Sequence, residues 1–243
     1  MIRDRRGVSE TVGFVLVFSL VLLTVGTVLT VGYGGLQDVR DAERVNNAQR
    51  AFDVLANNIE DITARGAPSR GTEIRLAEAS LGRGEPTILN ISADWGASNF
   101  STGNDSLGSI VYEAEGTQIR YAAGAVTRVQ SDGSVMLVDP NFVISDRRVI
   151  LPVVELVVEQ RSIAGSRTVL VRSVRNDRTV ELDREAVDRF ELNVTSPATD
   201  AWEGYLEDEG MNCSRLDDDR LACSIENLDR VQVVRFTIEV TFG

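Results

Sequence analysis

The stretch FVLVFSLVLLTVGTVLTV, residues 14–31, decides the fold of this chain. With Val12 and Gly13 it makes about twenty consecutive residues without a charge, and a helix of that length spans the roughly 30 Å hydrocarbon core of a bilayer. A cleavable secretory signal has a shorter apolar region of about 7–15 residues followed by a small-residue cut site, and no Ala-x-Ala follows this run. The sequence therefore predicts a transmembrane helix that stays in the mature protein.

Charges on either side of the run predict its orientation. Arg3, Arg5 and Arg6 precede it, whereas the first basic residue after it is Arg40. Because cytoplasmic flanks of a membrane span carry the excess of basic residues, we expect a cytoplasmic N-terminus. The predicted localisation is the cell membrane, with a single pass and an extracellular C-terminal domain.

A candidate processing site precedes the apolar run. Arg5 and Arg6 lead to Gly7, and Val8-Ser9-Glu10-Thr11-Val12-Gly13 then opens the helix. This order resembles the class III signal peptides of archaeal type IV pilins and archaellins, in which a basic patch ends in Gly or Ala before a Val-Ser start. The haloarchaeal start is usually Val-Ser-Pro-Val-Ile-Gly. Here Glu10 and Thr11 replace Pro and Val, and this difference favours a pilin-like protein over a main pilin subunit.

The resemblance implies that a prepilin peptidase cuts after Gly7 and that the mature chain begins at Val8. It also implies other pilin subunits and the pilus assembly machinery as partners. Glu10 departs from the family pattern, and its own chemistry makes it the candidate assembly residue. A carboxylate inside an apolar helix is costly if unpaired, and the new α-amino group of Val8, in the same or a neighbouring chain, would neutralise it. Two alternatives stay open: an ordinary anchor whose arginines only set topology, and a Glu10 that faces water at the membrane interface.

A second helical pattern follows the span. Apolar residues recur at steps of three and four from Leu36 to Ile62, with Arg40, Arg44 and Arg50 on the other side. Ala64–Gly71 then ends the helix, because Gly and Pro together stop it. The predicted domains are a cytoplasmic leader at 1–7, a transmembrane helix at 8–35, an amphipathic helix at 36–65 and a β-rich extracellular domain at 66–243.

Alternating patterns beyond residue 66 predict β-structure. In the final strand, 234–242, every second residue is apolar, so that one face is expected to meet a core. The predicted fold class is α+β: a long N-terminal helix, transmembrane and then amphipathic, followed by a sandwich-like domain in one or two sheets. The other expected elements are hairpins of 118–121 with 125–129 and of 135–138 with 142–145, strands at 149–159, 167–174, 179–183 and 188–195, and a short helix within 197–209.

Composition agrees with an outside location. The formal net charge is −12, and the chain contains neither Lys nor His. An acidic surface repels phosphates, which argues against nucleic acid as a partner. Acidic chains without Lys resemble proteins of extreme halophiles, where salt shortens the Debye length to about 3 Å and screens self-repulsion. The alternative is a merely acidic protein from a less saline environment.

The chain's two cysteines are predicted to form a disulfide. Asp217–Asp219 reads as a hairpin tip, and antiparallel pairing around it places Cys213 opposite Cys223, within the reach of a disulfide. So short a loop would stabilise the fold by somewhat under about 3 kcal/mol. The alternative is a pair of unlinked buried thiols.

Asn-x-Ser/Thr triplets mark candidate N-glycosylation sites, which have meaning only if the domain lies outside the cell. A Gly/Ser/Asn-rich segment around residue 100 is expected to be an exposed loop, and Asn193 alternates outward in its strand. The alternative is that all of them are unmodified surface residues. The candidates are Asn90, Asn99, Asn104, Asn193 and Asn212.

Motifs for catalysis are absent from the sequence. Without His there is no triad or imidazole base, without Lys there is no Walker loop, and two Cys cannot complete a zinc site. The acidic runs 207–209 and 217–219 are expected to be surface charge, with a calcium site as the alternative. We expect no enzyme, cofactor or metal, but a minor or accessory pilin-like subunit. The alternative is a permanently anchored extracellular binding module that does not assemble.

Overall fold

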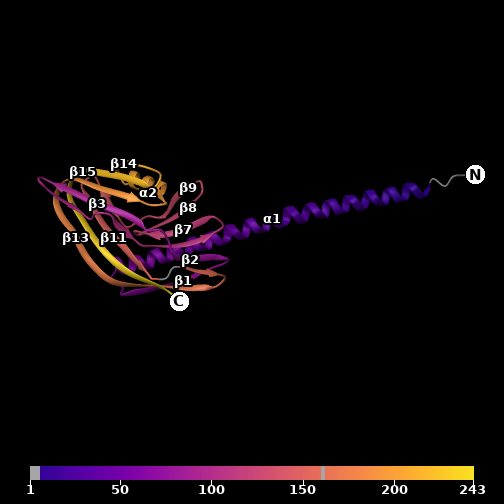
Figure 1. Cartoon of the computed structure of the whole chain (residues 1–243), viewed down its shortest axis with the longest axis horizontal. Coiled ribbons are helices and arrows are strands. Elements are labelled where there is room, and N and C mark those ends of the chain that lie inside the picture. Colours follow the sequence, from indigo (N-terminus) through magenta and orange to yellow (C-terminus); the bar gives the residue numbers. More distant parts are fainter. Residues whose placement is uncertain (1–5, 160–161) are drawn as a thin grey trace, which may run out of the picture. The chain divides into compact units, whose positions relative to one another are not determined.

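The structure is a computed structural model that describes residues 6–159 and 162–243, and for residues 6–10 and 31–38 it describes the backbone alone. The chain divides into two compact units, of which the first ends at Arg44 and the second spans Val45–Gly243. Helix α1 (Arg6–Thr63) begins in the first unit and ends in the second. A β-rich domain of two sheets follows, with one short helix, α2 (Thr199–Asp208) (Figure 1). The predicted α+β class is confirmed.

Sheet A is built around two long neighbouring strands, β13 and β15, which run side by side along the domain (Figure 1). Its path is β10-β11-β15-β13-β3-β4, while β1 pairs with β13, β14 with β15 and β5 with β3. Only β11 and β15 are parallel among these described pairs. The strands are β1 (Ser69–Arg75), β3 (Thr87–Trp95), β4 (Ser98–Ser101), β5 (Asp105–Leu107), β10 (Val143–Ser145), β11 (Arg148–Val158), β13 (Thr168–Thr195), β14 (Asn212–Arg215) and β15 (Arg220–Phe242).

Sheet B is antiparallel in all its described pairs and has the order β12-β2-β6-β7-β8-β9. Ala123 and Gly124, with φ of 52° and 90°, form the two-residue turn between β7 and β8, so the first predicted hairpin is confirmed. The strands are β2 (Ala79–Arg83), β6 (Ser109–Ala114), β7 (Thr117–Ala122), β8 (Ala125–Gln130), β9 (Gly133–Val138) and β12 (Ser162–Gly165).

The second predicted hairpin is wrong. Strand β9 pairs with β8 in sheet B, whereas β10 pairs with β11 in sheet A. The segment Asp139–Phe142 therefore carries the chain from one sheet to the other. Alternation and a turn signal identify strands, but they do not identify the partner of each strand when a connection changes sheets.

The three strands expected between 167 and 195 are one strand, β13, in the structure. The pairing of β13 with β15 shifts register between Arg175 and Asp177 and again between Val180 and Leu182. Each shift adds a residue to β13 and interrupts the alternation of its side chains. These bulges explain why the sequence pattern breaks where the strand does not.

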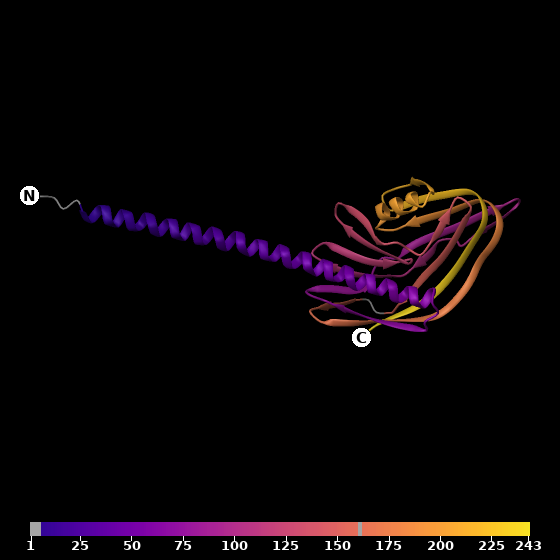
Figure 2. The same cartoon turned by 180° about the vertical axis from the view of Figure 1, so that it is seen from behind.

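The last turns of α1 pack into a hydrophobic cluster, which we call the α1 core. The end of α1 lies against the β-rich domain (Figure 2). Phe52, Leu55 and Ile62 are completely buried in this core, in one cluster with Tyr121 of sheet B and Ile238 of sheet A. These helix residues follow the predicted spacing of three and four, which places them on one face. The amphipathic pattern is therefore confirmed in the second unit.

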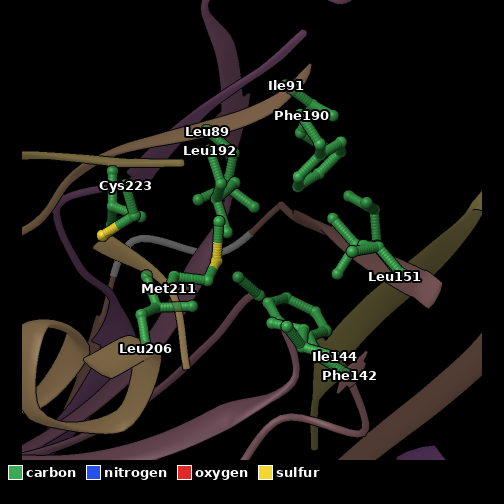
Figure 3. Close-up of a cluster of buried hydrophobic side chains, with 14 of the residues drawn as sticks. Leu89, Ile91, Phe142, Ile144, Leu151, Phe190, Leu192, Leu206, Met211 and Cys223 are labelled. Atoms are coloured by element: carbon green, nitrogen blue, oxygen red, sulfur yellow. The ribbon is translucent and has the colours of Figure 1, made fainter. Parts of the chain in front are cut away.

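A second cluster, the α2 core, lies around the short helix. Figure 3 shows Leu206 and Met211 beside strand residues that include Leu89 and Leu192. Trp202 of α2 is also buried, with its ring centroid 6.1 Å from that of Phe142. The short helix predicted within 197–209 is confirmed, and its role is to cover this core.

Strand β15 contributes to both cores. Val231 and Val233 belong to the α2 core, whereas Ile238 and Val240 belong to the α1 core. Successive side chains of a strand point to opposite faces, and the pairing of β11 with β15 is continuous through this region, so the odd- and even-numbered sets lie on opposite faces. The predicted apolar face of 234–242 is confirmed as buried.

Candidate functional site

The apolar span is the first candidate site. Among the described residues, Thr11–Thr30 is the one stretch of helix long and apolar enough to cross a membrane, and none of it is buried in the structure. The hydroxyls of Thr24, Thr27 and Thr30 donate to the backbone carbonyls of Leu20, Leu23 and Gly26, each four residues earlier. Such bonds satisfy hydroxyl groups without water. This surface is chemically compatible with lipid or with other apolar helices.

The processing and assembly residues predicted from the sequence cannot be placed by side-chain contacts. Arg5 lies outside the described residues, and Arg6, Gly7, Val8 and Glu10 lie where only the backbone is described, within α1. Their predicted roles remain predictions.

Cys213 and Cys223 form a disulfide, as predicted. They are register partners on β14 and β15, with a Cα–Cα distance of 4.1 Å. Cys223 is buried in the α2 core, and the hairpin closes with Leu216 N–H donating to Arg220 O at 2.9 Å. The disulfide thus joins the short edge strand β14 to the long strand β15 beside that core.

All the candidate glycosylation sites lie on one face of sheet A. Asn90 and Asn193 are register partners on β3 and β13, and each lies between buried residues that point into the α2 core. Asn99 pairs with Asp94, and Asn212 pairs with Ser224, so both follow the same outward alternation. Asn104 joins them because its Oδ1 accepts a hydrogen bond from Asn90 Nδ2 at 3.2 Å. These asparagines come from different parts of the sequence, and the strand pairing of sheet A places them on the same face.

Accessibility divides these asparagines into two groups. Asn99, Asn104 and Asn212 are exposed, whereas Asn90 and Asn193 are half-buried in paired strands. Directly opposed residues of antiparallel strands have Cβ atoms about 4.5–5.5 Å apart, which leaves no room for two glycans. The geometry therefore favours the three exposed sites over the opposed pair.

An arginine with three carboxylates around it joins four strands of sheet A. Arg235 of β15 is 14% exposed and forms ion pairs with Asp105 of β5, Glu155 of β11 and Glu181 of β13. Its Nε donates to Glu181 Oε1 at 2.5 Å and its Nη2 to Glu181 Oε2 at 3.3 Å. Burial lowers the pKa of Arg235, but the hydrogen bonds and charges of Glu181 and Asp105 outweigh burial and raise it. This cluster is structural, because every described partner belongs to the sheet itself.

Arg235→Gln should therefore lower the free energy of unfolding by about 2–3 kcal/mol at pH 7, because it leaves three converging carboxylates without a cation. Urea denaturation monitored by circular dichroism measures the change. Arg147→Gln is the matched control, since Arg147 and its partner Asp229 are 71% and 59% exposed and exposed pairs contribute little. Equal stabilities of the two variants would contradict the role of the Arg235 cluster.

The acidic runs do not come together as a metal site. Among the side chains that the structure describes, no group of three or more His, Cys, Asp or Glu could hold a metal ion. At the hairpin tip, the hydrogen bond from Arg220 to Asp217, 2.6 Å long, lowers the pKa of the Asp217 carboxyl. Asp217 in turn raises the pKa of Asp219 by sharing a hydrogen bond and by charge. These carboxylates are engaged with each other and with arginine.

One site escaped the sequence analysis: a cavity of about 730 Å³ on sheet B that contains the buried Arg120. Arg120 lies between Ile119 and Tyr121, so alternation predicts that it points away from the α1 core. Alternation does not reveal that the segment 83–85 and Pro197 line the same cavity. Only the tertiary structure identifies this arginine as buried.

Comparison with known proteins gives a single finding. A family model described as a family of unknown function (DUF7289) matches residues 6–241, which include both the apolar helix and the β-rich domain. No curated protein and no solved structure matches the chain.

Proposed function

Because this chain belongs to the DUF7289 family, whose function is unknown, we propose a function from its own residues: it is a pilin-like surface protein. It acts as a minor or accessory subunit of an archaeal type IV pilus-like filament, with a structural, adhesion or secretion role. It is held in the cell membrane by a single span, with the N-terminus in the cytoplasm and the β-rich domain outside.

One observation carries this proposal: α1 combines an exposed apolar segment with a buried amphipathic one in a single helix. Thr11–Thr30 has no buried residue, whereas the face from Ala48 to Ile62 is part of the α1 core. A protein that only needed a tether would not need its helix to continue as a core element. The family match supports this combination, because residues 6–241 include both the apolar helix and the β-rich domain.

In the proposed mechanism the span has two successive environments. It first holds the precursor in the bilayer, where its backbone and threonine hydroxyls are satisfied within the helix. After a prepilin peptidase cuts behind Gly7, the assembly machinery moves the helix into a filament. There, van der Waals packing between helices replaces contact with lipid.

The position of the mature N-terminus tests this proposal. We expect mass spectrometry of the protein purified from its own cells to show a chain that starts at Val8. A chain that still starts at Met1 or Ile2 would contradict processing and would leave the protein a permanent anchor.

Glu10 is the residue proposed to act in assembly. Glu10→Ala should reduce incorporation into sheared filaments at least tenfold while the protein remains in the membrane. The reason is that a carboxylate inside the membrane is costly unless it is neutralised, and the proposed partner of Glu10 is the α-amino group of Val8, which the variant could no longer pair with. Immunoblots of the sheared and membrane fractions measure this. Glu10→Gln is the control for size, and it should fail in the same way if charge is what matters. Unchanged incorporation of Glu10→Ala would remove the proposed role.

A permanently anchored binding module is the second candidate function. The observation that favours it is the Arg120 cavity, which a purely structural subunit does not require. Under this alternative the chain keeps its leader and is absent from filaments. The N-terminus of the mature chain separates the two proposals.

The face of sheet A that carries the candidate glycosylation sites indicates how the domain would be oriented in a filament. If the domain is outside the cell, the exposed Asn99, Asn104 and Asn212 are the proposed glycosylation sites. A face that carries glycans stays in solvent, so contacts with neighbouring subunits are proposed for the other surfaces of the domain. The acidic net charge of −12 supports an extracellular location in high salt and excludes no protein partner.

A further inference from the structure

The Arg120 cavity lies on the face of sheet B that points away from the α1 core. Ile119 and Tyr121 belong to that core, so Arg120 between them points to the opposite face. Its neighbours across the sheet are Val111 and Gly82, which line the same cavity. The volume of about 730 Å³ lies in the range of about 300–1,000 Å³ that is typical of ligand sites.

The segment 83–85 forms one wall of the cavity and is held by hydrogen bonds. Glu85 O accepts hydrogen bonds from Ser109 Oγ at 2.7 Å and from Arg120 Nη2 at 2.6 Å. A Cβ added at Gly84 would lie 2.2 Å from Val111 Cγ2, so only glycine allows the segment to approach the sheet this closely. The cavity is therefore built by fixed backbone and not by a loose loop.

Arg120 is a buried cation that lacks a carboxylate partner. It is only 2% exposed, and among the described residues no carboxylate oxygen lies within 4.0 Å of its nitrogens. Burial lowers the pKa of Arg120, and the charge of Glu85 offsets this only in part. A guanidinium has five N–H donors, and the bond to Glu85 O uses one of them. A buried charge without a partner is costly, so the remaining donors are suited to an anion.

Carboxylate partners are available to arginines elsewhere in the chain. Several partly exposed arginines form ion pairs: Arg230, for example, donates to both oxygens of Asp183 at 2.8 Å. A chain with 37 acidic residues has no shortage of carboxylates. Yet the only buried arginine among the described side chains has none.

Other polar groups converge on the same space. Gln118 is next to Arg120 on the cavity face, and its register partner across β6 is Glu113, which also lines the cavity. Within the described part of the chain, neither side chain has a hydrogen-bond partner. Their amide and carboxylate groups suit the hydroxyl groups of a ligand. The apolar lining is limited to Val111, Val129 and Pro197.

We propose that this cavity binds a sugar that carries a carboxylate, such as a uronic acid, with the carboxylate on Arg120 and the hydroxyls on Gln118 and Glu113. Arginine and carboxylate match as planar, charge-assisted hydrogen-bonding partners. Glu85 and Glu113 offset the charges of Arg83 and Arg120, so the cavity has no excess positive charge for a ligand with several negative charges, which disfavours a nucleotide. The small apolar lining offers no pocket for the side chains of a peptide. The proposal holds whether or not the chain assembles into filaments.

Isothermal titration of the full chain in detergent micelles with glucuronate tests the site. We expect saturable binding, at least tenfold weaker binding of glucose, and at least tenfold weaker binding of glucuronate to Arg120→Gln, since each change removes a charge-assisted hydrogen bond. Arg128→Gln is the matched control, because Arg128 lies on the adjacent strand β8 but does not line the cavity. It should bind glucuronate as the unmodified protein does.

Arg120→Gln could also disturb the fold, so Gln118→Ala provides an independent measure. Gln118 is half-buried, and its loss should weaken glucuronate several-fold without a change in the thermal unfolding midpoint. Tighter binding of a uronate oligosaccharide than of glucuronate would assign the site to an acidic polysaccharide, and equal binding to the free sugar acid. Absence of saturable binding of both, or equal binding by Arg120→Gln and the unmodified protein, would overturn the proposal and leave Arg120 with only the structural role of holding the segment 83–85.

Discussion

Phe52→Ala should lower the free energy of unfolding of the β-rich domain by about 3–5 kcal/mol. Phe52 is completely buried in the α1 core, where the last turns of α1 meet both sheets. Removing its ring loses the transfer free energy of a large apolar group and leaves a cavity that packed neighbours fill only in part. For a domain with a typical stability of about 5–15 kcal/mol this is a large fraction of the total.

Urea denaturation of the full chain in micelles, monitored by the fluorescence of Trp202 in the α2 core, measures this loss. Val54→Ala is the control on the same helix, because the Val54 side chain is 51% exposed and little packing is lost with it. If both variants unfold at the same urea concentration, α1 is not an integral part of the domain. In that case α1 would be only a tether, and the proposed pilin-like subunit would lose its main support.

Gly108→Ala should destabilise the domain by about 3 kcal/mol, near the upper end of overpacking effects. A Cβ at this position would lie 2.1 Å from Leu156 O and 3.1 Å from Leu156 C. Both are backbone atoms of β11, which is paired along its length with β15. The clash therefore cannot be relieved by a rotamer change, and one of the strands has to move.

Gly204→Ala is the matched control for the same chemical change. Gly204 is an exposed residue of α2, and no atom lies within 4 Å of the added Cβ. Because Ala is a better helix former than Gly, this variant should gain up to about 1 kcal/mol. Thermal unfolding of the two variants should shift in opposite directions, and a shared direction would refute the close approach at Gly108.

Local rules explain which parts of the fold the sequence predicted. The stripe that contains Phe52, the alternation of 234–242 and the opposition of Cys213 and Cys223 each depend on residues close together in the chain. The pairing of β9 and β10 with different sheets depends on distant strands, and the predicted hairpin there was wrong. The bulges of β13 interrupt the alternation of its side chains, so that three strands were predicted where the structure has one.

The candidate sites follow the same division. The apolar span and the sequons are local signals, although their gathering on one face of sheet A needed the register of the strands. Arg120 and Arg235 look alike in the sequence, since both are arginines within alternating strands. The difference between them, a cavity for one and three carboxylates for the other, arises from segments more than thirty residues away.

The sharing of β15 between two cores has a mechanical consequence. A pull on α1 loads the α1 core, and β15 transmits that load directly to the α2 core on its other face. Strand β13, which is paired with β15 over most of its length, also contributes residues to both cores. We therefore expect the two cores to unfold together rather than one after the other.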